Sequence, residues 1–175
     1  MPRKTKKVTA GDIFSLPTPD HRLGLGQVIV GGTVFYIAVF EGLFEAVPED
    51  LATSLDRDIL LVGWTTDALL HHNEWHLVGN AAPIIDRVPF PDYKVRVNGD
   101  PFVHDFSGKN YRPASSEDWE FFELKSTRAP IAFQSALHAS CGLREWESRF
   151  DGITFSHVKR QAKDRLGTDS LSLRH

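Results

Sequence analysis

The segment QVIVGGTVFYIAVF, residues 27–40, constrains the fold most strongly, because β-branched and aromatic residues lie on both sides of a glycine pair. Such residues suit a pleated, half-buried surface, and adjacent glycines supply a tight turn. We therefore expect a β-hairpin with strands at about 26–30 and 33–40 that turns at Gly31 and Gly32.

Other segments carry weaker strand signals of the same kind. GDIFSLPTP predicts a short strand that prolines end, and the continuous apolar run DILLVGW, 58–64, predicts a central strand covered on both faces. Asn98-Gly99, the strongest short turn signal, lies between two alternating runs and predicts a second hairpin, followed by a short strand near Tyr111. Prolines exclude a long regular element between 81 and 92.

Helical spacing is confined to short stretches and to the C-terminal third. Leu51 and Leu55 permit at most a short helix in 48–56, and the polar cap SSED leads into 117–124. From Pro130 the apolar residues recur every three or four positions up to Phe150, with Gly142 expected to kink or end the first part. A last helix is expected over SHVKRQAKDRL, 156–166.

The predicted fold class is α+β and mostly β. We expect an antiparallel, strongly curved sheet or small barrel-like core, with one main helix in the C-terminal third. The expected organisation is a disordered basic arm at 1–9, a single globular domain at 10–152, and a basic helix or tail at 153–175.

Charge is distributed unevenly along the 175 residues. Residues 1–7 carry four basic and no acidic side chains, and 153–175 carry five basic against two acidic, so 8–152 hold a formal charge of −10 within a total of −3. An acidic globule grips nucleic acid poorly and suits a basic partner better. The alternative is that surplus carboxylates only keep the surface soluble.

The chain contains no apolar run near the roughly 20 residues of a membrane span and no secretory signal at its start. A single cysteine, Cys141, suits a reducing compartment. A cytoplasmic location is therefore expected.

The stretch HHNEWH, 71–76, raises the question of a metal site. On a helix, His72 and His76 would share a face and could bind one ion with Glu74 nearby, as in a metal-dependent hydrolase. On a strand the two histidines would lie about 13 Å apart, too far for a common ion. Alternation around Trp75 and the following glycine favour the strand, with the histidines as flanking surface and no metal.

Three other patterns in the sequence bear on chemistry. GLGQVIVGG lacks the strand, glycine loop and helix order that binds phosphate. Cys141 and His138 could form a nucleophile and base pair, but a cysteine on an apolar helix stripe is more often core filling. Carboxylates gather in SSEDWEFFEL and would usually mark a solvated helix face: Glu117, Asp118, Glu120 and Glu123. No catalytic residue and no cofactor is therefore expected.

The motifs GDIFSLPTPDHRLGLGQVI, EWHLVGNAAP, VPFPDY and HDFSGKNYRPASSEDWEFFEL, taken in this order and spacing, resemble the immunity protein 26 family of bacterial polymorphic toxin systems. The resemblance covers about residues 10–140, and residues 141–175 have no recognised counterpart. The Gly-x-Gly turn falls on Gly24 and Gly26, where we expect fold-forming glycines.

This resemblance implies a mostly β, non-enzymatic cytoplasmic protein that binds and neutralises a toxin made by the same cell. We expect an acidic face, with Glu117, Asp118, Glu120 and Glu123 as candidate partner contacts, to meet a cognate toxin protein, for example a basic nuclease. The alternative is a small β-barrel module that binds nucleic acid through the basic arms, which the charge distribution disfavours.

Overall fold

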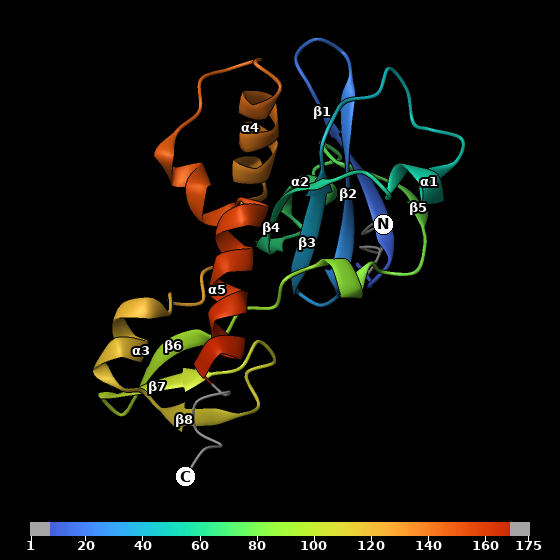
Figure 1. The fold of residues 1–175 in the computed structure, drawn as a ribbon. Coiled ribbons are helices and arrows are strands. Elements are labelled where there is room, and N and C mark those ends of the chain that lie inside the picture. Colours follow the sequence, from blue (N-terminus) through green and yellow to red (C-terminus); the bar gives the residue numbers. More distant parts are fainter. Residues whose placement is uncertain (1–7, 169–175) are drawn as a thin grey trace. The chain divides into compact units, whose positions relative to one another are not determined.

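The computed structural model describes residues 8–168, with side chains to residue 162, and the chain divides into two compact units (Figure 1). Unit 1 comprises Met1–Val88 and Thr127–Phe155, and unit 2 comprises Pro89–Ser126 and Ser156–His175. The sequence-based boundaries at residues 10 and 152 divide the chain differently and stay a prediction. Val8, which the sequence analysis placed in a disordered arm, is buried in the core of unit 1.

Unit 1 is built on a five-stranded antiparallel sheet with the order β4-β3-β2-β1-β5. Its strands are β1 (Asp12–Pro17), β2 (Leu23–Val30), β3 (Val34–Phe40), β4 (Ile59–Thr66) and β5 (His76–Asn80). The first four form a meander, and the chain then returns across the sheet to place β5 beside β1. The hairpin predicted at Gly31-Gly32 is confirmed as β2 and β3.

Helices and 3₁₀ turns complete unit 1. They are α1 (Leu51–Ser54), α2 (Ala68–His71), η1 (Ile85–Arg87), α4 (Pro130–Ser140) and η2 (Ser148–Ile153). Helix α4 ends before Gly142, which has a φ of 74°. The prediction that the helical stripe continues to Phe150 is wrong, because the left-handed residue turns the chain and Phe150 enters the core from η2 instead.

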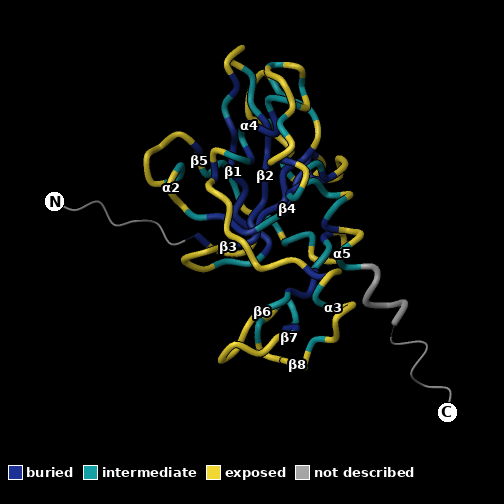
Figure 2. The backbone as a smooth tube through the Cα atoms, turned by 90° about the vertical axis from the view of Figure 1, so that its left-hand side faces the viewer, coloured by how far each residue is buried: buried dark blue, intermediate teal, exposed yellow. Residues whose placement is uncertain are grey.

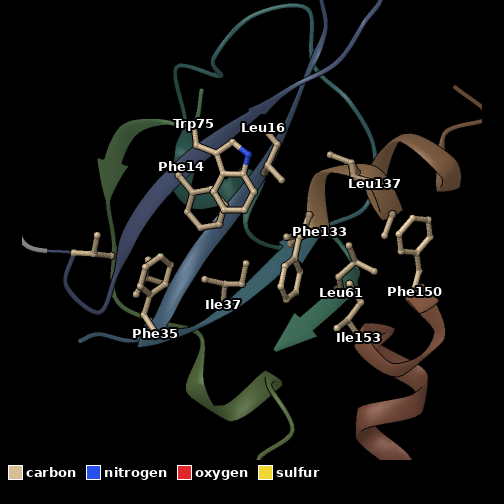
Figure 3. Close-up of a cluster of buried hydrophobic side chains, with 14 residues drawn as sticks. Phe14, Leu16, Phe35, Ile37, Leu61, Trp75, Phe133, Leu137, Phe150 and Ile153 are labelled. Atoms are coloured by element: carbon tan, nitrogen blue, oxygen red, sulfur yellow. The ribbon is translucent and has the colours of Figure 1, made fainter. Parts of the chain in front are cut away.

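The core of unit 1 lies between one face of the sheet and the α4–η2 segment (Figure 3). Phe133 and Leu137 come from α4, and Phe150 and Ile153 from η2. They face side chains that alternate along the strands, among them Phe14, Leu16, Ile37 and Leu61. Figure 2 shows that burial is concentrated in these strands.

Strand β4 is at the edge of the sheet, so the prediction of a central strand is wrong. The run DILLVGW is apolar because β4 is covered along its free edge as well as on its faces. Leu61 and Trp64 form isolated bridges with Thr154 and Thr127, respectively. A covered edge strand therefore has the same composition as a central one.

Unit 2 contains a three-stranded antiparallel sheet with the order β6-β7-β8. Its strands are β6 (Tyr93–Val97), β7 (Asp100–His104) and β8 (Tyr111–Pro113). The hairpin predicted at Asn98-Gly99 is confirmed, with positive φ angles of 52° and 94° at the two turn residues. Helix α3 (Ser116–Phe121) follows β8, and α5 (Phe155–Thr168) covers the last helix that was predicted.

The structure confirms the predicted fold class: α+β, with antiparallel strands and a helical C-terminal third. The larger sheet is open between β4 and β5, so the term barrel-like describes the core only loosely and the barrel is not closed. Closure would require these two edges to pair, and β4 is instead bridged by residues that flank the helices. Within residues 8–168, no helix is long and apolar enough to cross a membrane.

Candidate functional site

The HHNEWH stretch forms a short helical turn followed by a strand. Helix α2 ends at His71, Asn73 has a φ of 58°, and β5 begins at His76. His71, His72 and His76 are exposed. Among the residues that the structure describes, no group of three or more His, Cys, Asp or Glu side chains is arranged to hold a metal ion.

Trp75 is the structural anchor of that stretch. Its side chain is 1% exposed and stacks on Phe14, with ring centroids 4.8 Å apart and planes inclined by 8°. The indole Nε1–H donates to Gln134 Oε1 on α4 at 2.8 Å, and Gln134 Nε2 donates to the Pro17 carbonyl at 3.2 Å. Trp75 therefore ties β5, β1 and α4 together, as its predicted place in the core requires.

Cys141 and His138 do not bond to each other in the structure. His138 Nε2 lies 2.9 Å from the Pro17 carbonyl oxygen, which can only accept, so this nitrogen carries the proton. Cys141 Sγ lies 3.7 Å from Ser140 Oγ, and the cysteine packs against the hydrophobic core. The geometry agrees with core filling.

A surface hollow of about 550 Å³ lies beside His138. Its lining comes from the β1–β2 turn, the end of α4 and the segment after it: Pro19, His138, Leu143, Arg144, Glu145 and Glu147. Arg144 donates to Ser135 Oγ at 2.9 Å and pairs with Glu147, so the guanidinium is already occupied within the wall. The hollow is open to solvent and brings together no catalytic constellation.

The four carboxylates predicted as partner contacts have different roles. Asp118 completes a capping box with Ser115 and accepts a two-pronged bond from Arg112 at 2.6 and 2.7 Å, and these donors lower the pKa of Asp118 to about 2. Glu123 lies 2.8 Å from His157 Nε2. Glu117 and Glu120 are exposed and form no hydrogen bond or ion pair with any described residue.

Two of those four residues thus stabilise unit 2 itself. Sequence reasoning missed this because Arg112 and His157 lie on other elements. The role of the four residues as partner contacts stays a prediction.

The Gly-x-Gly motif is explained by close packing. A Cβ on Gly24 would overlap Leu137 of α4, and a Cβ on Gly26 would lie 2.6 Å from Phe14 Cε2. Neither glycine has a positive φ. The motif therefore builds the core, as expected of fold-forming residues, and offers no ligand site.

The connection between β3 and β4, residues 41–58, is strongly acidic, and we call it the acidic loop. It carries six carboxylates against Arg57 alone, a net charge of −5, and all six are exposed: Glu41, Glu45, Glu49, Asp50, Asp56 and Asp58. Asp50 caps α1 through Thr53. None of the six forms an ion pair with a residue that the structure describes.

Hydrogen bonds anchor both ends of the acidic loop. The backbones of Leu23 and Phe44 exchange two hydrogen bonds of 2.9 and 2.8 Å, and Glu41 N donates to Asp58 O at 2.9 Å at the base of the loop. Arg87 donates to the carbonyl oxygens of Leu55, Asp56 and Arg57 at 2.5, 3.4 and 2.6 Å.

Helix α1 adds a side-chain contact, because Leu51 packs directly against Gly79 of β5 beside it (Figure 1). The two ends of the loop and α1 are therefore anchored to the sheet and to Arg87. Sequence reasoning treated the segment only as a possible short helix, although its length and charge were signals of a functional loop.

Comparison of this chain with family models, with curated proteins and with solved structures found no match.

Proposed function

We propose that this chain is a cytoplasmic, non-enzymatic immunity protein that binds a basic toxin of its own cell and blocks it. The observation that carries the proposal is the acidic loop, a net charge of −5 on a backbone fixed at both ends and by α1. The resemblance to the immunity protein 26 family supports the same function.

The physical basis is electrostatic steering onto a preorganised surface. Carboxylates that form no ion pair with a described residue keep their charge for an incoming cation, and anchored loop ends limit the entropy lost on binding. A nuclease toxin must display lysine and arginine where it holds phosphates, so the acidic loop complements that surface. Occupying such a site excludes nucleic acid from it.

The test is the rate of association with the protein encoded by the adjacent gene, measured by stopped-flow at several salt concentrations. The variant Glu45→Gln/Glu49→Gln/Asp56→Asn removes three charges from the acidic loop and is expected to slow association by about tenfold or more and to weaken its salt dependence. The matched control removes three exposed charges of unit 1 outside the loop: Asp67→Asn/Glu74→Gln/Asp86→Asn.

Equal association rates for the two variants would contradict the role of the acidic loop. No binding by the unmodified protein would contradict the function itself. Salt-sensitive binding to bulk DNA or RNA that is lost on deletion of 1–7 and 153–175 would favour the nucleic-acid alternative.

A further inference from the structure

Unit 2 exposes two large apolar side chains close together in the chain. Phe121, the last residue of α3, is 36% exposed and Leu124 is 60% exposed. They are three positions apart, so their Cα atoms lie within about 10 Å of each other. Neighbouring exposed apolar side chains are typical of an interaction surface, because leaving them in water costs free energy that binding recovers.

The same region carries two exposed carboxylates, Glu117 and Glu120, that form no hydrogen bond or ion pair with the described residues of unit 2. Glu117, Glu120 and Phe121 are spaced i, i+3 and i+4 and therefore share one face of α3. We call Glu117, Glu120, Phe121 and Leu124 the α3 patch. An apolar pair beside unpaired carboxylates is complementary to an apolar surface bordered by lysine or arginine.

The support beneath the α3 patch is rigid. Lys94 Nζ donates to the Trp119 carbonyl at 2.8 Å, and the Arg96 guanidinium lies 4.6 Å from the centroid of the Trp119 ring. Lys94 N also donates to Glu123 O at 3.0 Å, which fixes the backbone next to Leu124. Arg112 donates to Asp118, so three basic residues of the sheet contact α3 or the residues next to it. Glu117 and Glu120 are exposed to solvent.

We propose that the α3 patch is a second docking surface, which takes an apolar surface bordered by lysine or arginine on the protein partner. This inference rests on the proposed function, since it assumes that such a partner exists. The patch combines two apolar side chains with two carboxylates, whereas the acidic loop is mainly charged, so the patch governs how long the complex lasts and the loop governs how fast it forms.

The test is calorimetric titration of the full chain with the protein encoded by the adjacent gene. Phe121→Ser/Leu124→Ser is expected to weaken affinity by about tenfold or more, chiefly through faster dissociation. The matched control is Val34→Ser/Ile131→Ser, which removes two exposed apolar side chains of unit 1 and is expected to bind like the unmodified protein. Glu117→Gln/Glu120→Gln removes the charge of two exposed carboxylates at nearly unchanged shape and is also expected to weaken binding.

The outcomes separate this inference from the proposed function. If the unmodified protein binds and both α3 variants bind equally well, the inference is overturned while the function stands. If the unmodified protein does not bind, the proposed function is overturned and the inference with it. If the unmodified protein is a dimer that Phe121→Ser/Leu124→Ser dissociates, the patch joins two copies of the chain and the inference is overturned.

Discussion

Replacement of Trp75 by phenylalanine tests whether the HHNEWH stretch anchors the fold through its tryptophan. Phenylalanine keeps a ring against Phe14 but removes the indole N–H, which leaves Gln134 Oε1 without that donor. Loss of the donor to this partly buried acceptor, together with part of the buried ring, costs about 1–3 kcal/mol. Trp75→Ala removes the whole buried ring and is expected to cost about 3–5 kcal/mol.

The histidines provide the internal comparison. Because His72 and His76 are exposed, His72→Ala/His76→Ala is expected to change the free energy of unfolding by no more than about 0.5 kcal/mol per site. A metal site would reverse this order, since losing ligands from a structural site costs far more.

Urea unfolding at 25 °C, followed by far-ultraviolet circular dichroism, measures these differences. A loss of about 2 kcal/mol lowers the unfolding midpoint by about 1 M. The double variant Trp75→Phe/Gln134→Met no longer contains the unpaired acceptor. Its loss of unfolding free energy is therefore expected to be smaller than the sum of the losses in the two single variants. The reasoning is refuted if the histidine variant is less stable than Trp75→Phe.

Three further predictions concern the fold. Gln27→Leu is expected to destabilise unit 1 by about 2 kcal/mol or more in urea unfolding, because the fully buried amide holds the backbone of 81–84 through three hydrogen bonds. Gly26→Ala is expected to cost about 1–3 kcal/mol in the same assay, since its Cβ would overlap Phe14. Arg112 lowers the pKa of Asp118, so the ionised Asp118 stabilises the fold above about pH 4, and this contribution is lost as the pH falls towards 2. Asp118→Asn is expected to abolish this pH-dependent contribution when unfolding is followed during acid titration.

Turn and cap residues in the sequence predicted the two hairpins and the start of α3, because these elements depend on residues close together in the chain. Both hairpins were found because Gly31-Gly32 and Asn98-Gly99 supply the positive φ angles or tight turns that hairpins need. The cap of α3 was found because Ser115 and Asp118 satisfy each other's backbone groups.

Features that depend on distant partners could not be predicted. The place of β5 beside β1, and the edge position of β4, follow from pairing across the sheet. The four carboxylates of residues 117–123 looked equivalent in sequence, and only the positions of Arg112 and His157 separate Asp118 and Glu123 from Glu117 and Glu120. The acidic loop could have been found by counting charge per connection.

The proposed function is tested most directly by inhibition. The purified chain is mixed in increasing ratio with the toxin domain encoded by the adjacent gene, and the activity of that domain is followed. Toxin activity is expected to fall linearly and to be lost at a one-to-one ratio, with less inhibition by Glu45→Gln/Glu49→Gln/Asp56→Asn at matched dilute concentrations. Full toxin activity at an equimolar ratio would contradict the proposed function.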